Sequence, residues 1–152
     1  MYPHTHFLFA LFLGIVANYM GLMSMSFAFS CAFLAVFIDV DHIVEHAFKC
    51  KSKPFSFRSM WNNCTHFHRY KERSFIHHKE GMILMTLLTG GLLLVSIPLG
   101  LVVGIAYSSH MLLDHLKTKR MVSKRFMGFY LVETYNAFVL DISLVVMILL
   151  ML

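Results

Sequence analysis

The chain has 152 residues, enough for one domain, and 58% of them are hydrophobic whereas only 14% are charged. Soluble domains carry about 25% charged residues, so this composition argues against a soluble protein and predicts an integral membrane protein. The net charge of +5 indicates a surface that faces lipid headgroups rather than nucleic acid. Three cysteines without a C-x-x-C pair argue against a disulfide framework or a cysteine-based zinc site.

The apolar residues form three blocks, at 7–38, 82–113 and 126–152. A hydrocarbon core needs roughly 20 helical residues to cross it, and the first block would extend about 48 Å as one helix. We therefore divide the first block near Asn18–Gly21 and the second at Ser96–Gly100, where glycine and proline favour a turn. A single tilted or kinked span over the first block is the alternative and gives four helices.

This division predicts one all-α, multi-pass membrane bundle over residues 1–152, built from two helical hairpins and a C-terminal helix. The predicted helices are residues 5–19, 23–40, 81–96, 99–116 and 128–151. No Lys or Arg precedes the first apolar run, so we expect a retained membrane helix there and not a signal peptide.

All thirteen Lys and Arg lie in two segments, 49–79 and 117–125. In the hairpin arrangement both segments fall on one side of the membrane, and the positive-inside tendency makes that side cytoplasmic. The basic loop 47–80 and the N-terminus are then cytoplasmic, and the C-terminus is outside. The short spans suit a prokaryotic plasma membrane.

Acids and imidazoles stand where the predicted helices end on this cytoplasmic side. His110 and Asp114 are four residues apart, so both side chains lie on one helix face. The acids of FIDVDH end an apolar helix, where the helix dipole and nearby lipid both disfavour them. A bound cation would offset that cost, whereas a solvated helix end at the interface is the alternative.

Imidazole nitrogens and carboxylate oxygens suit Zn²⁺, Mn²⁺ or Fe²⁺. We predict one or two divalent metal ions, with zinc preferred. His4 and His6 at the start of the first helix, and His77 and His78 before the third, add imidazoles at the same face. Arg73 lies near them, and its planar guanidinium could bind an anionic oxygen.

Four motifs occur in a fixed order: THFLFALFLG, FIDVDH, RSFIHHKEG and YSSHMLLDHL. Together they resemble the YdjM-type family of membrane-bound metal-dependent hydrolases, which is grouped with zinc-dependent phospholipase C. That family has P-D-x-D-H after its second helix, H-R-G-x-T-H-S before its third and S-H-x-x-x-D at the end of its fourth. The resemblance covers roughly residues 5–118. It implies the metal ligands His6, Asp39, Asp41, His42, His77, His110 and Asp114. In the hydrolase that it implies, Asp39 or Asp41 is the general base and Arg73 binds the substrate phosphate.

The chain also departs from the family pattern. Ile38 replaces the usual proline, and Glu72 stands where the first histidine of H-R-G-x-T-H-S is expected. His66 or His68 is an alternative source of that histidine.

The resulting hypothesis is a hydrolase of a phosphoester, such as a phospholipid headgroup, that uses metal-activated water at the cytoplasmic face. Its expected partners are membrane lipids, and nucleic acid is not expected. The alternatives are a metal-ion transporter or metal-binding membrane protein, a haem-b electron carrier, and a non-catalytic member of the family. Asp141 has either a hydrogen-bonding role or, in the transporter alternative, a place on the ion path.

Overall fold

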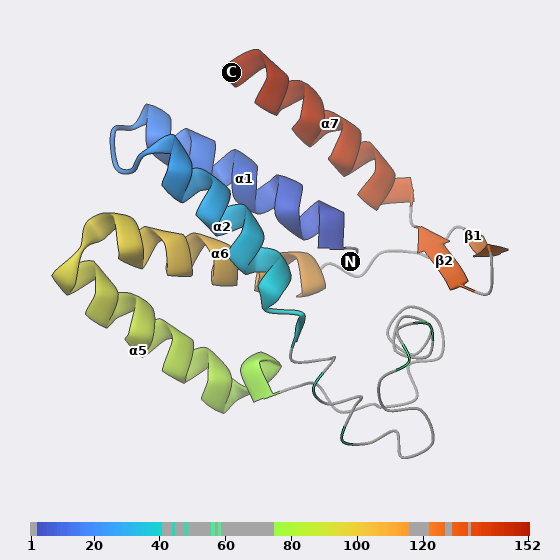
Figure 1. Ribbon diagram of the computed structural model, residues 1–152, viewed down its shortest axis with the longest axis horizontal. Coiled ribbons are helices and arrows are strands. Elements are labelled where there is room, and N and C mark those ends of the chain that lie inside the picture. The colour runs from blue at the N-terminus through green and yellow to red at the C-terminus, as the bar shows by residue number, and fades with distance from the viewer. Residues whose placement is uncertain are drawn as a thin grey trace.

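The computed structural model describes residues 3–40, 75–115, 122–126, 129–133 and 135–152, together with Val44, Phe48, Ser56 and Arg58. The described residues form five α-helices, one short 3-10 helix and one two-stranded hairpin (Figure 1). In chain order these are α1 (Pro3–Tyr19), α2 (Met25–Phe37), η2 (Phe75–His77), α5 (Lys79–Val95), α6 (Ile97–His115), β1 (Val122–Phe126), β2 (Phe129–Glu133) and α7 (Tyr135–Met151). The prediction of an all-α fold is confirmed for the bundle of five helices, called the helical body below, and the β1–β2 hairpin is an addition to it.

The prediction of one helix over 128–151 is wrong in its first part. Residues 129–133 form β2, which pairs antiparallel with β1, and α7 begins only at Tyr135. The β2 sequence FYLVE is rich in aromatic and β-branched residues, which favour a strand. The first four helices, by contrast, begin and end within three residues of the predicted ranges.

The turn between α1 and α2 depends on local side-chain chemistry. Gly21 has a positive φ of 72°, which glycine adopts without steric cost. The Asn18 amide donates a hydrogen bond of 2.8 Å to the Met23 carbonyl and so closes the turn. The first apolar block is therefore two helices, and the single-span alternative is wrong.

The helices pack in the order α7, α1, α2, α6, α5, with α1 also touching α6. Small residues line the closest contacts. A Cβ added to Gly14 of α1 would lie 2.8 Å from the Ala28 Cα of α2, so the two backbones approach closely at this point. Ala28 belongs to one buried cluster, with Leu11, Ile15, Ala32 and Ile148. A second buried cluster, of mostly small side chains from α1, the α1–α2 turn, α2 and α6, consists of Ala10, Ala17, Met23, Cys31, Ala35, Val102 and Ala106. Small residues at helix contacts are typical of membrane bundles.

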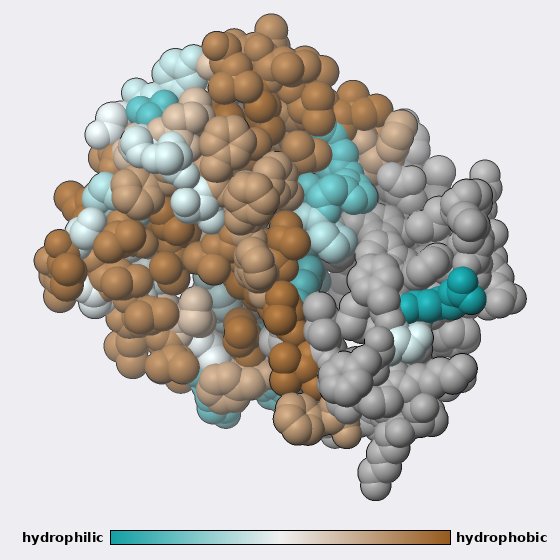
Figure 2. Space-filling view, in the orientation of Figure 1, coloured by the Kyte–Doolittle hydropathy of each residue, from teal (hydrophilic) through white to brown (hydrophobic). Residues whose placement is uncertain are grey.

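Large apolar side chains cover much of the outer surface, which Figure 2 shows as brown atoms over the helical body. On α5 and α7 they include Leu87, Leu94, Val95, Leu149 and Leu150, each at least 68% exposed. By length and composition, α6 is the one helix among the described residues that could cross a membrane, and α2 and Ala137–Met151 are shorter apolar helices.

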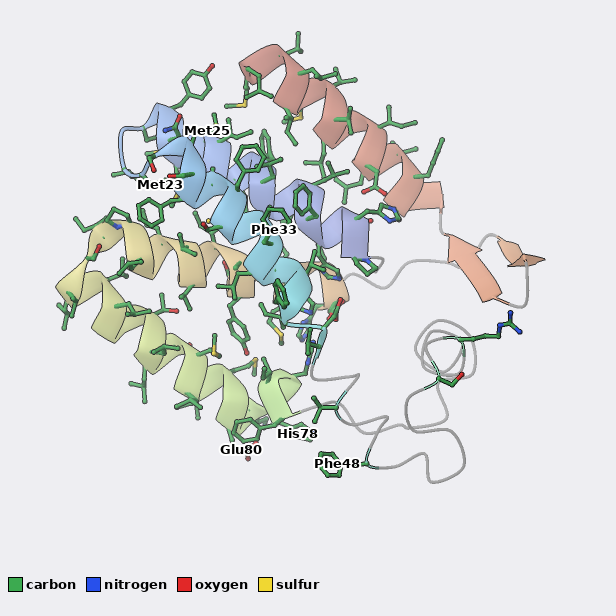
Figure 3. The ribbon with its side chains drawn as sticks, in the orientation of Figure 1. Met23, Met25, Phe33, Phe48, His78 and Glu80 are labelled. Atoms are coloured by element: carbon green, nitrogen blue, oxygen red, sulfur yellow. The ribbon has the colours of Figure 1, made fainter. Side chains whose placement is uncertain are left out.

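The helical body has two unlike ends. The α1–α2 turn, the α5–α6 turn and the C-terminus lie at one end, whereas the start of α1, the end of α2, η2 and the end of α6 lie at the other (Figure 1). Figure 3 shows Met23 and Met25 at the first end, and His78 and Glu80 where α5 begins. The predicted ligands among the described residues are all at this second end.

Candidate metal centre

Five of the predicted metal ligands come together from four segments of the chain. His6 comes from α1, Asp39 from just beyond α2, His77 from η2, and His110 and Asp114 from the last turns of α6. Their ligand atoms form two groups, each with all atoms within 4.8 Å of one another. One group is His6, Asp39 and His110, and the other is His77, His110 and Asp114.

The second group is a nearly equilateral triangle. His77 Nε2 lies 3.3 Å from His110 Nε2 and 3.2 Å from Asp114 Oδ2, and the His110–Asp114 separation is also 3.2 Å. Tetrahedral zinc with bonds of 2.0–2.1 Å needs ligand atoms about 3.3 Å apart. These three ligands therefore already have the spacing of one face of a metal tetrahedron.

His110 is completely buried, with 0% exposure, and its tautomer is fixed by a backbone carbonyl. Its Nδ1 lies 2.9 Å from the Ala35 carbonyl oxygen, which only accepts, so Nδ1 carries the hydrogen. In the neutral ring, Nε2 then offers a lone pair toward two carboxylate oxygens, 3.4 Å away on Asp39 and 3.2 Å away on Asp114. The Nε2 lone pair and the two carboxylate oxygens are all hydrogen-bond acceptors, so they repel one another unless a cation lies among them. That cation is either a metal ion or a second proton on the His110 ring.

His6 is 1% exposed and stacks on the His110 ring with centroids 4.1 Å apart. Its Nε2 lies 3.4 Å from Asp114 Oδ1. Neither ring nitrogen has a hydrogen-bond partner among the described residues, although buried polar atoms normally have one. Metal coordination fits a buried nitrogen of this kind.

The two groups share His110, and its single Nε2 lone pair can bind only one ion, so the two groups cannot each use His110 for a separate ion. Asp114, however, directs Oδ2 toward His77 and His110 and Oδ1 toward His6. The cluster therefore suits either one ion or two ions bridged by the Asp114 carboxylate. The imidazoles are buried, whereas Asp39 and Asp114 are 27% and 26% exposed, so the cluster opens on its carboxylate side.

Two residues that the sequence did not single out hold His77 in place. The Tyr107 hydroxyl donates a 2.9 Å hydrogen bond to the carbonyl of Ile76. A Cβ on Gly81 would lie 2.3 Å from the Phe75 carbonyl oxygen, so only glycine lets α5 begin this close to η2. The glycine that ends RSFIHHKEG was a visible signal, whereas nothing in the sequence distinguished Tyr107 from other aromatic core residues.

Changing Tyr107 to phenylalanine is expected to weaken zinc binding by roughly tenfold, the lower end of the loss typical for outer-shell changes. The change removes one hydroxyl and frees the η2 backbone that carries His77. Competition titration with a chromophoric chelator measures the affinity. Tyr19→Phe is the matched control, because its hydroxyl also donates to a carbonyl, that of Met151, at the opposite end of the bundle. Equal zinc affinity in the two variants would contradict this role for Tyr107.

Three further predicted site residues, Asp41, His42 and Arg73, lie outside the described residues, as does Glu72. Their roles stay predictions.

The chain matches no protein-family model, no curated protein and no solved structure. The resemblance in motif order is therefore a hypothesis that rests on the four motifs alone.

Proposed function

We propose that this chain is a multi-pass membrane protein and a divalent-metal-dependent hydrolase of a phosphoester, such as a phospholipid headgroup. The observation that carries the proposal is the triangle of His77, His110 and Asp114, with ligand atoms 3.2–3.3 Å apart. Three protein ligands are typical of catalytic zinc, whose remaining position takes water or substrate, whereas structural zinc has four. If two ions are bound, the four ligands His6, His77, His110 and Asp114 would likewise leave coordination positions open on both ions.

The helix lengths support a substrate at the membrane surface. The five helices have 13 to 19 residues, or about 20–28 Å at 1.5 Å per residue. A hydrocarbon core is about 30 Å thick, so a bundle this short draws its ends toward headgroup depth. The cluster lies at one of these ends, near the ester bonds of a lipid. The grouping of Lys and Arg makes that side cytoplasmic.

A bound divalent ion would activate a water molecule and stabilise charge on the phosphoryl oxygens. The protein supplies its ligands from His77, His110, Asp114 and His6. Asp39 lies on the open side, with Oδ1 3.4 Å from His110 Nε2, and we assign it the role of general base. It takes the proton of the attacking water as the new phosphorus–oxygen bond forms. As the old bond breaks, the leaving alkoxide takes a proton from solvent on the open side of the cluster, and Asp39 later returns its own proton to solvent.

The test uses full-length protein in nanodiscs with a panel of synthetic phospholipids and a soluble phosphodiester. We expect turnover that EDTA removes and that Zn²⁺ or Mn²⁺ restores. Asp39→Asn is expected to lower kcat by roughly 10²- to 10⁴-fold, the range of general acid–base catalysis, while the metal stays bound. Glu80→Gln is the matched control, since Glu80 is an exposed carboxylate in the first turn of α5 and belongs to neither ligand group.

Protein that holds metal but hydrolyses no phosphoester in the panel would sink the hydrolase proposal. Uptake of the same metal into proteoliposomes would then favour the transporter.

A further inference from the structure

Helix α7 is mostly apolar, and Asp141 is its one acidic residue. The Asp141 side chain is 13% exposed and faces α1. Its Oδ2 accepts a 3.1 Å hydrogen bond from the hydroxyl of Thr5 and lies 2.9 Å from His4 Nε2. An acid on an apolar membrane helix is costly, so such residues are usually paired and functional. This pairing ties α7 to the first turns of α1.

The pairing matters because of the residue that follows Thr5. His6 is a candidate metal ligand, yet its ring nitrogens have no hydrogen-bond partner among the described residues. In a metal-binding histidine, the ring nitrogen that does not bind the metal usually donates a hydrogen bond to a nearby acceptor, which fixes the orientation of the ring. His110 does this through the Ala35 carbonyl. The orientation of the His6 ring depends on its stacking on His110, on the Asp114 carboxylate 3.4 Å from its Nε2 and on the placement of the α1 backbone.

Thr5 determines where the α1 backbone lies at this turn. It is 0% exposed, and its hydroxyl, the only polar atom of its side chain, donates a hydrogen bond to Asp141. The two helices run parallel, because Thr5 meets Asp141 near their starts and Tyr19 meets Met151 at their ends. Apolar contacts alone would allow α1 to slide or rotate against α7. The carboxylate fixes both movements at the turn that carries His6.

We propose that Asp141 is a positioning residue for the metal centre: it holds His4 and Thr5 and so fixes the turn of α1 that presents His6. The inference rests on the proposed function only in requiring that the cluster binds metal. It does not depend on which substrate is hydrolysed or on whether hydrolysis occurs.

The experiment is a titration of full-length protein with Co²⁺ alone, followed by its visible absorption. Asp141→Leu and the isosteric Thr5→Val each remove the link between α7 and α1. Both are expected to weaken Co²⁺ binding by roughly 10- to 100-fold, the range seen for outer-shell changes, and to alter the cobalt spectrum. Ser143→Ala is the matched control on α7, because among the described residues the Ser143 hydroxyl donates a hydrogen bond only to the carbonyl of Val139 in its own helix. That variant is expected to bind Co²⁺ as the wild type does.

A double-variant cycle separates positioning from general loosening of the fold. If Asp141 acts through His6, adding Asp141→Leu to His6→Ala costs no further Co²⁺ affinity. An equal loss with and without His6 would overturn the proposal. So would Co²⁺ affinity within twofold of wild type in both Asp141→Leu and Thr5→Val.

The same titration distinguishes this inference from the hydrolase proposal. Wild type that binds Co²⁺ with the expected Asp141 dependence, but turns over no phosphoester, upholds the positioning role and overturns the hydrolase. Wild type that binds no Co²⁺ overturns both.

Discussion

Replacing His110 with alanine is expected to abolish divalent-metal binding and all metal-dependent turnover. His110 belongs to both ligand groups, and its Nε2 lies 3.2–3.4 Å from ligand atoms of His77, Asp39 and Asp114. Its removal leaves neither group with three ligands. The zinc affinity should therefore fall by more than the roughly 100-fold upper range of outer-shell changes, as measured by chelator competition.

His115→Ala is the control for this variant. His115 is on the same helix and exposed, and its ring is bonded to the Met111 carbonyl one turn earlier. Zinc affinity should be unchanged in this variant. Because alanine at the buried position 110 leaves a cavity, Asp114→Asn gives a second, nearly isosteric test at a residue with 26% exposure. Wild-type zinc affinity in a folded His110→Ala protein would contradict the ligand assignment.

Gly81→Ala is expected to weaken zinc binding, although residue 81 is not a ligand. The added Cβ would lie 2.3 Å from the Phe75 carbonyl oxygen and 2.8 Å from the Ile76 Cα. Both neighbours are backbone atoms, so η2 must move, and it carries His77 with it. We expect zinc affinity to fall by at least roughly tenfold, the scale of an outer-shell change, while circular dichroism shows unchanged helix content.

The same helix provides a matched control. A Cβ on Gly91 would meet nothing within 4 Å. Gly91→Ala should therefore leave zinc affinity unchanged and stabilise α5 by up to about 1 kcal/mol, the helix preference of alanine over glycine. Equal zinc affinity in Gly81→Ala and Gly91→Ala would show that the η2–α5 junction does not position His77.

The helix breaks were predictable because local chemistry determines them. Gly21 and Asn18 make the first turn, and Pro98 lies in the first turn of α6, where its missing N–H costs little. Asp39, His110 and Asp114 were predictable because polar residues at the ends of apolar helices are conspicuous. His6 and His77 were chosen over the nearby His4 and His78 only through the motif resemblance. The β2 strand was not, since a short apolar run has no period that separates strand from helix.

The groups that orient the ligands could not be read from the sequence. The carbonyl of Ala35 is a backbone atom, and every residue has one. The contacts of Tyr107 with Ile76 and of Asp141 with Thr5 join residues 31 and 136 positions apart. Only the packing of the helices brings such residues together, and no local sequence pattern predicts which residues will meet.

The central claim is that the cluster at the end of the bundle binds a divalent metal ion. The most direct measurement is metal content by inductively coupled plasma mass spectrometry. It compares wild type with the double variant His110→Ala, Asp114→Ala, both purified in detergent, loaded with Zn²⁺ and Mn²⁺ and dialysed. We predict one or two bound ions per wild-type chain, and none above background in a double variant of equal helix content. Wild type without metal, or equal metal in both proteins, would contradict the account.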